Sequence, residues 1–116
     1  MRKEIKLELN GQTYIYTFGL GFLGECLDNL GFTPPELDKR CETNPFKTLP
    51  QMMYESIKYN NEIDFTQKEF IKLLNDDERG WEKAGFFYGE YLKSMVQNVP
   101  KQPTNKKKVI PQLKKQ

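Results

Sequence analysis

The stretch EIKLELNGQTYIYTFGLGFLGECL, residues 4–27, decides the fold because its hydrophobic periodicity changes partway along. Up to Phe18, apolar and polar residues alternate, as on a strand with one buried face. Asn10-Gly11 interrupts the alternation with a residue pair that favours the type I′ turn of a hairpin. We therefore predict a β-hairpin with a two-residue turn. Its expected cross-strand pairs are Leu9 with Gln12, Leu7 with Tyr14 and Ile5 with Tyr16.

After this hairpin the spacing becomes helical. Leu23, Leu27 and Leu30 fall in register, and Gly31 stands where a helix C-cap is expected. Because a lone hairpin is marginal in water, its apolar face must cover helices or join the sheet of a partner chain. The glycines of GLGFLG, residues 19–24, also have the spacing of a dinucleotide-binding loop. A hairpin rather than a βαβ unit precedes them, so nucleotide binding is not expected.

The middle of the chain is expected to be helical. Thr33 before Pro34 predicts a short helix that runs to about Cys41. A second helix, starting at about Pro45 or Phe46, carries small and apolar side chains at three- and four-residue steps. These side chains are Leu49, Met52, Met53, Ser56 and Ile57.

Two further helices follow. Thr66 and Glu69 form a T-x-x-E capping box, which marks a helix start. The stretch DDERGWEKAGFFYGEYLKSMVQNV has helical spacing throughout and predicts the longest helix. We expect its leading acids, Asp76, Asp77 and Glu78, to occupy the first turn, where the helix dipole favours negative charge.

Charge is divided unevenly along the chain. Through Val99 there are 12 basic and 16 acidic residues, whereas residues 100–116 contain six lysines and no acid. Pro100 and Pro103 end the helical periodicity. We predict an α+β, mainly α-helical fold, with a single domain over residues 1–99 in which an N-terminal β-hairpin is followed by four to five helices. Residues 100–116 are expected to form a disordered, flexible tail rich in Lys, Pro and Gln.

Groups that could perform catalysis are scarce. The chain contains no histidine, which removes the commonest general base and metal ligand. Cys26 and Cys41 have no base to activate them and no CxxC spacing, so we expect free thiols rather than a disulfide, a nucleophile or a zinc site. We therefore expect no enzymatic activity, no cofactor and no metal site.

The N-terminal sequence MRKEIKLELN is charged rather than apolar, so it does not resemble a signal peptide. No stretch approaches the roughly 18 apolar residues of a membrane-spanning helix. We expect a soluble, intracellular protein without a membrane partner.

Aromatic residues crowd the last predicted helix. Phe86, Phe87, Tyr88 and Tyr91 point around more than half of its circumference, so one small core cannot bury all of them. We expect some of them to face a protein partner, together with adaptable methionines. The candidate partner-binding residues are Met52, Met53, Trp81, Phe86, Phe87, Tyr88, Tyr91 and Met95.

The order of elements resembles the tail assembly chaperones of long-tailed, siphovirus-like bacteriophages over about residues 3–96. The resemblance is carried by a G-x-x-Y turn from Gly11 to Tyr14, by the step Phe18-Gly19, by the NPF of residues 44–46, and by the T-x-x-E helix start. None of these motifs is a catalytic signature.

The resemblance implies a non-enzymatic chaperone that binds and solubilises the hydrophobic tape-measure protein and helps to recruit tail-tube subunits. Such a chaperone needs exposed apolar surface. The resemblance further implies a homo-oligomer that acts in the cytoplasm of the bacterial host and is absent from the mature virion. An exposed hairpin edge would offer strand addition as a route to oligomers.

The basic tail leaves alternatives open. It is expected to be a flexible arm or linker, or only a solvated chain end. The alternative function is a small nucleic-acid-binding regulator that acts through this tail and binds less tightly as salt rises. The acidic body argues against nucleic acid as a partner. The lysines concerned are Lys106, Lys107, Lys108, Lys114 and Lys115.

Overall fold

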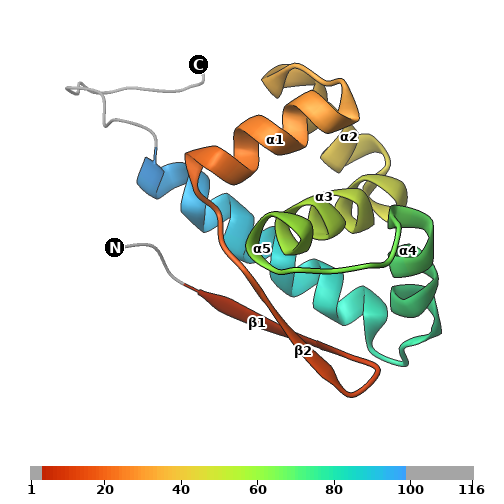
Figure 1. Ribbon diagram of the computed structural model, residues 1–116. Helices are drawn as coiled ribbons and strands as arrows, with labels where there is room; N and C mark the ends of the chain where they lie inside the picture. Colours follow the sequence, from red (N-terminus) through yellow and green to blue (C-terminus); the bar gives the residue numbers. More distant parts are fainter. Residues whose placement is uncertain (1–3, 99–116) are drawn as a thin grey trace, which may run out of the picture.

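The computed structural model describes residues 4–98 and contains a two-stranded antiparallel hairpin followed by five helices (Figure 1). The strands are β1 (Ile5–Leu9) and β2 (Gln12–Tyr16). The helices are α1 (Leu20–Leu30), α2 (Pro34–Thr43), α3 (Pro45–Asn60), α4 (Gln67–Asp76) and α5 (Gly80–Asn98). The predicted α+β, mainly helical fold is confirmed. The predictions for the tail, residues 100–116, fall outside the described residues.

The hairpin has the predicted register, with Leu9 opposite Gln12, Leu7 opposite Tyr14 and Ile5 opposite Tyr16. Both turn residues have positive φ, 51° at Asn10 and 77° at Gly11, as a type I′ turn requires. Alternate residues of β1 are buried, so one face of the hairpin covers helices of the same chain. That burial supplies the support that an isolated hairpin lacks.

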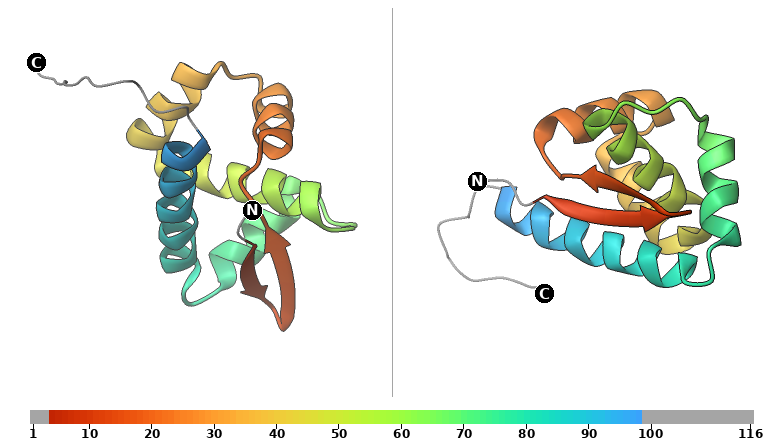
Figure 2. Two further views of the ribbon diagram at one scale, coloured as in Figure 1. Left: turned by 90° about the vertical axis from the view of Figure 1, so that its left-hand side faces the viewer. Right: turned by 60° about the horizontal axis from the view of Figure 1, so that its bottom comes forward.

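Helix α3 lies at the centre of the molecule. It packs against α1, α2, α4, α5 and β2, and Figure 2 shows the other elements arranged around it. Its residues from Thr48 to Ile57 are all buried, except for the half-buried Gln51. A helix covered on so many sides cannot be strictly amphipathic, which explains why polar Ser56 and Glu55 are buried there too.

Aromatic side chains join the hairpin to α1 and α5. Phe18, in the connection between β2 and α1, lies with its ring centroid 5.0 Å from that of Phe87 and 5.9 Å from that of Phe22. Tyr16 lies 5.1 Å from Phe87 between ring centroids. The Ser94 hydroxyl donates to the backbone carbonyl of Phe18, with 3.1 Å between the oxygens. These contacts fix the start of α1 against the middle of α5.

The acidic cluster does not lie in the first turn of α5, and that prediction is wrong. Asp76 is the last residue of α4, and Asp77 is its C-terminal cap. The Asp77 carboxylate accepts 2.7 Å hydrogen bonds from the Arg79 backbone N–H and from the Lys83 ammonium, so it closes the turn instead of facing a helix dipole. The helix begins only at Gly80.

Candidate functional site

Four of the eight predicted partner-binding residues lie in the core, which corrects their assignment. Met52, Met53 and Phe87 have no exposed surface, and Tyr91 is 3% exposed. The reason is the central position of α3, since the methionines that looked available for a client are surrounded by neighbouring elements. Phe87 is covered by the rings of the hairpin and its connection.

Both cysteines are buried free thiols, as predicted. Burial raises the pKa of Cys26 to about 12 and that of Cys41 to about 11. The Cys41 thiol points to the thioether of Met52, with 3.5 Å between the sulfur atoms. Neither thiol is poised for nucleophilic chemistry, because a reactive cysteine needs a lowered pKa and access to a substrate. Within residues 4–98 no cluster of His, Cys, Asp and Glu could hold a metal ion.

One apolar surface is formed by a stripe on α1 and a stripe on α5. We call it the α1–α5 apolar face. Its members recur at three- and four-residue steps, so each stripe lies along one side of its helix. Leu20 and Leu92 are 77% and 47% exposed, and the others are half-buried. The face consists of Leu20, Leu23, Leu27, Tyr88, Leu92 and Met95.

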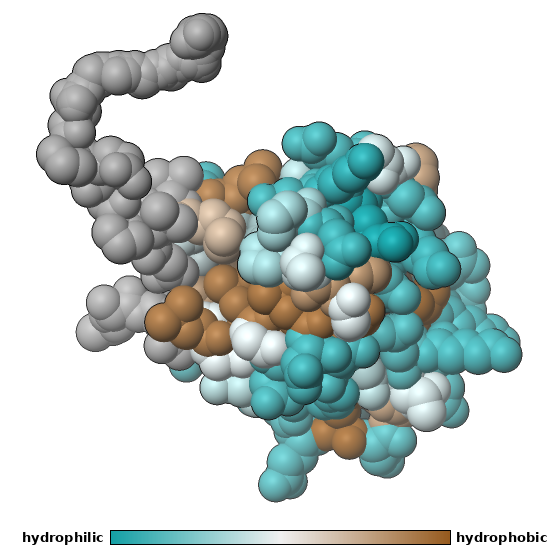
Figure 3. Space-filling view, turned by 90° about the horizontal axis from the view of Figure 1, so that it is seen from above, coloured by the Kyte–Doolittle hydropathy of each residue, from teal (hydrophilic) through white to brown (hydrophobic). Residues whose placement is uncertain are grey.

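The two stripes lie on helices that both pack on α3. Phe22 and Cys26 turn inward from α1, which leaves Leu23 and Leu27 on the flank of that helix. The opposite flank is occupied at Gly21, where an added Cβ would meet the ring of Tyr59. Among the described residues, α1 and α5 pack mainly on α3 rather than on each other. Figure 3 shows a hydrophobic band across the upper face of the molecule, with hydrophilic surface on both borders.

Acidic side chains border the α1–α5 apolar face. Helix α1 contributes exposed Glu25 and Asp28 and contains no basic residue. Burial raises the pKa of Tyr88, and Cys41, Glu42 and Asp38 of α2 lie close enough to raise it further. A ligand with apolar groups and basic flanks would match this arrangement, because opposite charges at the rim favour the correct encounter.

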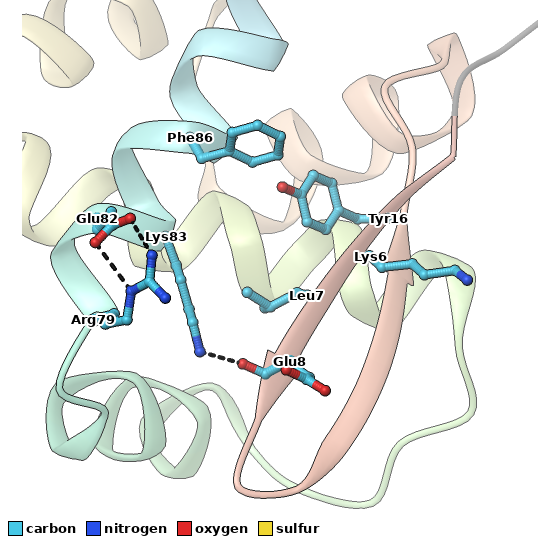
Figure 4. A pocket seen from close by; sticks show the side chains of 8 residues that line it. All are labelled: Lys6, Leu7, Glu8, Tyr16, Arg79, Glu82, Lys83 and Phe86. Carbon is cyan, nitrogen blue, oxygen red and sulfur yellow. Dashed lines mark hydrogen bonds and ion pairs between the residues drawn. The ribbon is translucent and has the colours of Figure 1, made fainter.

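A second surface lies between the outer edge of β1 and the first half of α5. It forms a cavity of about 270 Å³. Figure 4 shows the side chains that line this cavity, with Phe86 on α5 facing the hairpin. The Lys83 ammonium donates to the Glu8 carbonyl at the strand edge, and the Arg79 guanidinium pairs with the Glu82 carboxylate at 2.6 Å. Lysine at an edge strand hinders the addition of another strand.

The opposite edge of the hairpin is also occupied. The Asn61 side chain accepts from the Ile15 N–H at 3.1 Å and donates to the Ile15 carbonyl at 2.6 Å. An amide side chain thus takes the place that a further strand would fill. Strand addition at either edge would have to displace a side chain, so the hairpin offers a weaker route to self-association than the sequence predicted.

A third surface carries an exposed aromatic pair. The rings of Phe46 and Trp81 are stacked with centroids 4.6 Å apart and planes 25° apart. They remain 72% and 53% exposed. Sequence reasoning named Trp81 as a partner-binding candidate, whereas it used Phe46 only as a possible helix start and as part of the NPF motif. The eight predicted partner-binding residues are therefore divided between the core and three separate surfaces.

Comparison with known protein families, with curated proteins and with solved structures gave no match to this chain. No helix in the described part of the chain has the length and apolar character needed to cross a membrane.

Proposed function

We propose that this protein is a non-enzymatic, helix-binding chaperone of phage tail assembly. In this role it binds and solubilises the tape-measure protein and helps to recruit tail-tube subunits. The observation that supports the proposal is the α1–α5 apolar face, which leaves two leucine-bearing helices incompletely covered. The tape-measure client and the tail-tube partner come from the resemblance of residues 3–96 to tail assembly chaperones.

The geometry of the face suits an amphipathic helix as a ligand. Such helices present residues at i, i+3, i+4 and i+7, and they bind in apolar grooves between helices. Leu20, Leu23 and Leu27 supply apolar side chains from α1, and Tyr88 and Met95 supply them from α5. Methionine adapts to clients of irregular shape because its side chain is flexible and polarisable.

Self-association and an absence from the mature particle are part of the same proposal. Many copies of a chaperone that coats a long client would bind side by side along that client. The shared client would then strengthen weak contacts between the copies. The bacterial cytoplasm is the compartment in which phage tails assemble, and free buried thiols are compatible with its reducing conditions.

The test is co-expression with a long, predominantly helical protein from the same genome. We expect the client to be soluble and to co-elute with the chain in size-exclusion chromatography. The double variant Leu20→Ser with Leu92→Ser should leave the client insoluble, because both leucines are exposed members of the apolar face.

The matched control is Phe86→Ser, since Phe86 is 55% exposed but lies on the β1 side of α5. It should retain the soluble complex. If Phe86→Ser abolishes client solubility while the double leucine variant preserves it, the apolar face is not the client-binding surface.

A further inference from the structure

The Phe46–Trp81 pair is the starting point for a second assignment. We call the surface that surrounds it the aromatic platform. The two rings line a cavity of about 400 Å³ together with several apolar residues. These apolar residues are Pro50, Ile71, Leu74 and Ala84. Exposed stacked rings over an apolar hollow are a surface on which another chain segment can pack.

The charged residues that line this platform are all acidic. Asp77 and Glu78 line the cavity, and none of its lining residues is basic. The Asp77 carboxylate is already paired with Lys83 at 2.7 Å, whereas the structure gives Glu78 no ion pair among residues 4–98. The platform therefore favours a ligand that combines apolar groups with positive charge.

The chain contains one segment with this chemistry. Residues 100–116 hold six lysines, three prolines and no acid, and Val109, Ile110, Pro111 and Leu113 stand between two lysine clusters. Proline-containing segments dock on surfaces lined by aromatic side chains, and lysine ammonium groups are attracted to aromatic faces and carboxylates.

The length of the segment allows it to reach the platform. Trp81 lies at the start of α5, and the described part of that helix ends at Asn98. At about 1.5 Å per residue the two positions are roughly 25 Å apart. An extended segment covers about 3.1 Å per residue, so about nine residues after Asn98 span that distance. Lys108 to Leu113 would then lie at the platform.

We propose that residues 100–116 of this chain dock on the aromatic platform of the same molecule, with the Val109–Leu113 stretch against Phe46 and Trp81 and a lysine beside Glu78. Docking within one molecule is favoured over docking between copies because the short connection gives a high effective concentration. This assignment does not depend on the chaperone proposal, since the apolar face and the platform share no residue.

Trp81 reports on this contact directly, because it is the single tryptophan of the chain. The experiment measures acrylamide quenching of its fluorescence in the full-length protein and in the full-length variant Ile110→Ser with Leu113→Ser. We expect quenching to be about twofold stronger in the variant, with emission shifted to longer wavelength, because Trp81 would regain contact with water. Equal quenching in the two proteins would overturn the proposal.

Repeating the comparison in proteins that also carry a substitution in the platform makes the test specific. Glu78→Gln or Phe46→Ala should shrink the difference that the tail substitutions cause, because either change weakens the platform, while Phe86→Ala should leave that difference intact. The measurement is repeated over a range of protein concentrations. A tail effect that persists in both platform variants, or that is present only at high concentration, would also overturn the proposal.

Discussion

The side chain of Asn61 occupies the outer edge of β2, where a further strand could otherwise pair. Asn61 pairs with both backbone groups of Ile15 and so completes β2 as a neighbouring strand would. Its amide also donates to the Ile57 carbonyl at 2.8 Å, which joins the end of α3 to the hairpin. Sequence reasoning could not find this contact, because 46 residues separate the partners and nothing in the local pattern around Asn61 indicates it.

Replacing Asn61 by Ala should therefore destabilise the protein. The change leaves the N–H and carbonyl of Ile15 without their partner, and an unsatisfied polar group costs about 1–3 kcal/mol. Chemical denaturation followed by circular dichroism measures the loss. Asn75→Ala is the control, because Asn75 is exposed on α4 and should change the free energy of unfolding by less than about 0.5 kcal/mol. Equal effects of the two changes would contradict the assigned role of Asn61.

Because the thiols are buried, the free energy of unfolding should fall as the pH rises through the alkaline range. The folded state raises the pKa of Cys26 from 9.0 to about 12, so the folded protein retains a proton that the unfolded chain releases. The stability contributed by the protonated thiol is present in full below pH 9.0 and is lost as the pH rises towards about 12. Cys26→Ala should reduce this pH dependence in urea titrations.

Cys41, Tyr16 and Tyr91, whose pKa values burial also raises, should account for the pH dependence that remains in that variant. At pH 9, alkylation of both cysteines should be slow in the native protein and fast in the denatured chain. Rapid native labelling of Cys26 would contradict the burial that the structure gives it.

At the scale of elements, local chemistry predicts the boundaries well where a capping motif exists. The Thr66 hydroxyl accepts from the Glu69 N–H, and the Glu69 carboxylate accepts from the Thr66 N–H, as the T-x-x-E motif predicted. Gly31 caps α1 with a φ of 74°. The predicted boundary between α4 and α5 was wrong because Asp77 accepts a hydrogen bond from the backbone of a tight turn, and helix-dipole reasoning alone does not distinguish the two uses of an acid.

Gly80 makes that tight turn possible, and a pair of glycine substitutions tests its role. A Cβ added at Gly80 would lie 2.1 Å from the Leu74 carbonyl oxygen, whereas one added at Gly85 meets nothing within 4 Å. Gly80→Ala should lower the melting temperature, because a backbone atom must move. Gly85→Ala should raise it slightly, since alanine is favoured in a helix by about 0.5–1 kcal/mol. Thermal unfolding compares the two, and a stabilising Gly80→Ala would show that α4 and α5 are joined differently.

At the scale of the whole molecule, the sequence predicts the elements and their order but not which helix lies at the centre. The register of the hairpin followed from Asn10-Gly11 and alternation, because both act locally. Burial of Met52 and Met53 depends on five elements packing around α3, and helical periodicity reports a helix's apolar side without showing how many neighbours cover it. The exposed stripes of α1 and α5 likewise became visible only once their neighbours were in place.

The measurement that tests the central claim most directly is the binding of an amphipathic client helix to the α1–α5 apolar face. Fluorescence anisotropy would follow a labelled helical segment of the candidate client with wild type, with the double variant Leu20→Ser and Leu92→Ser, and with Phe86→Ser. We predict that the leucine variant weakens binding by at least about tenfold, because apolar surface is no longer buried, and that Phe86→Ser does not. Equal affinity for all three proteins would contradict the account.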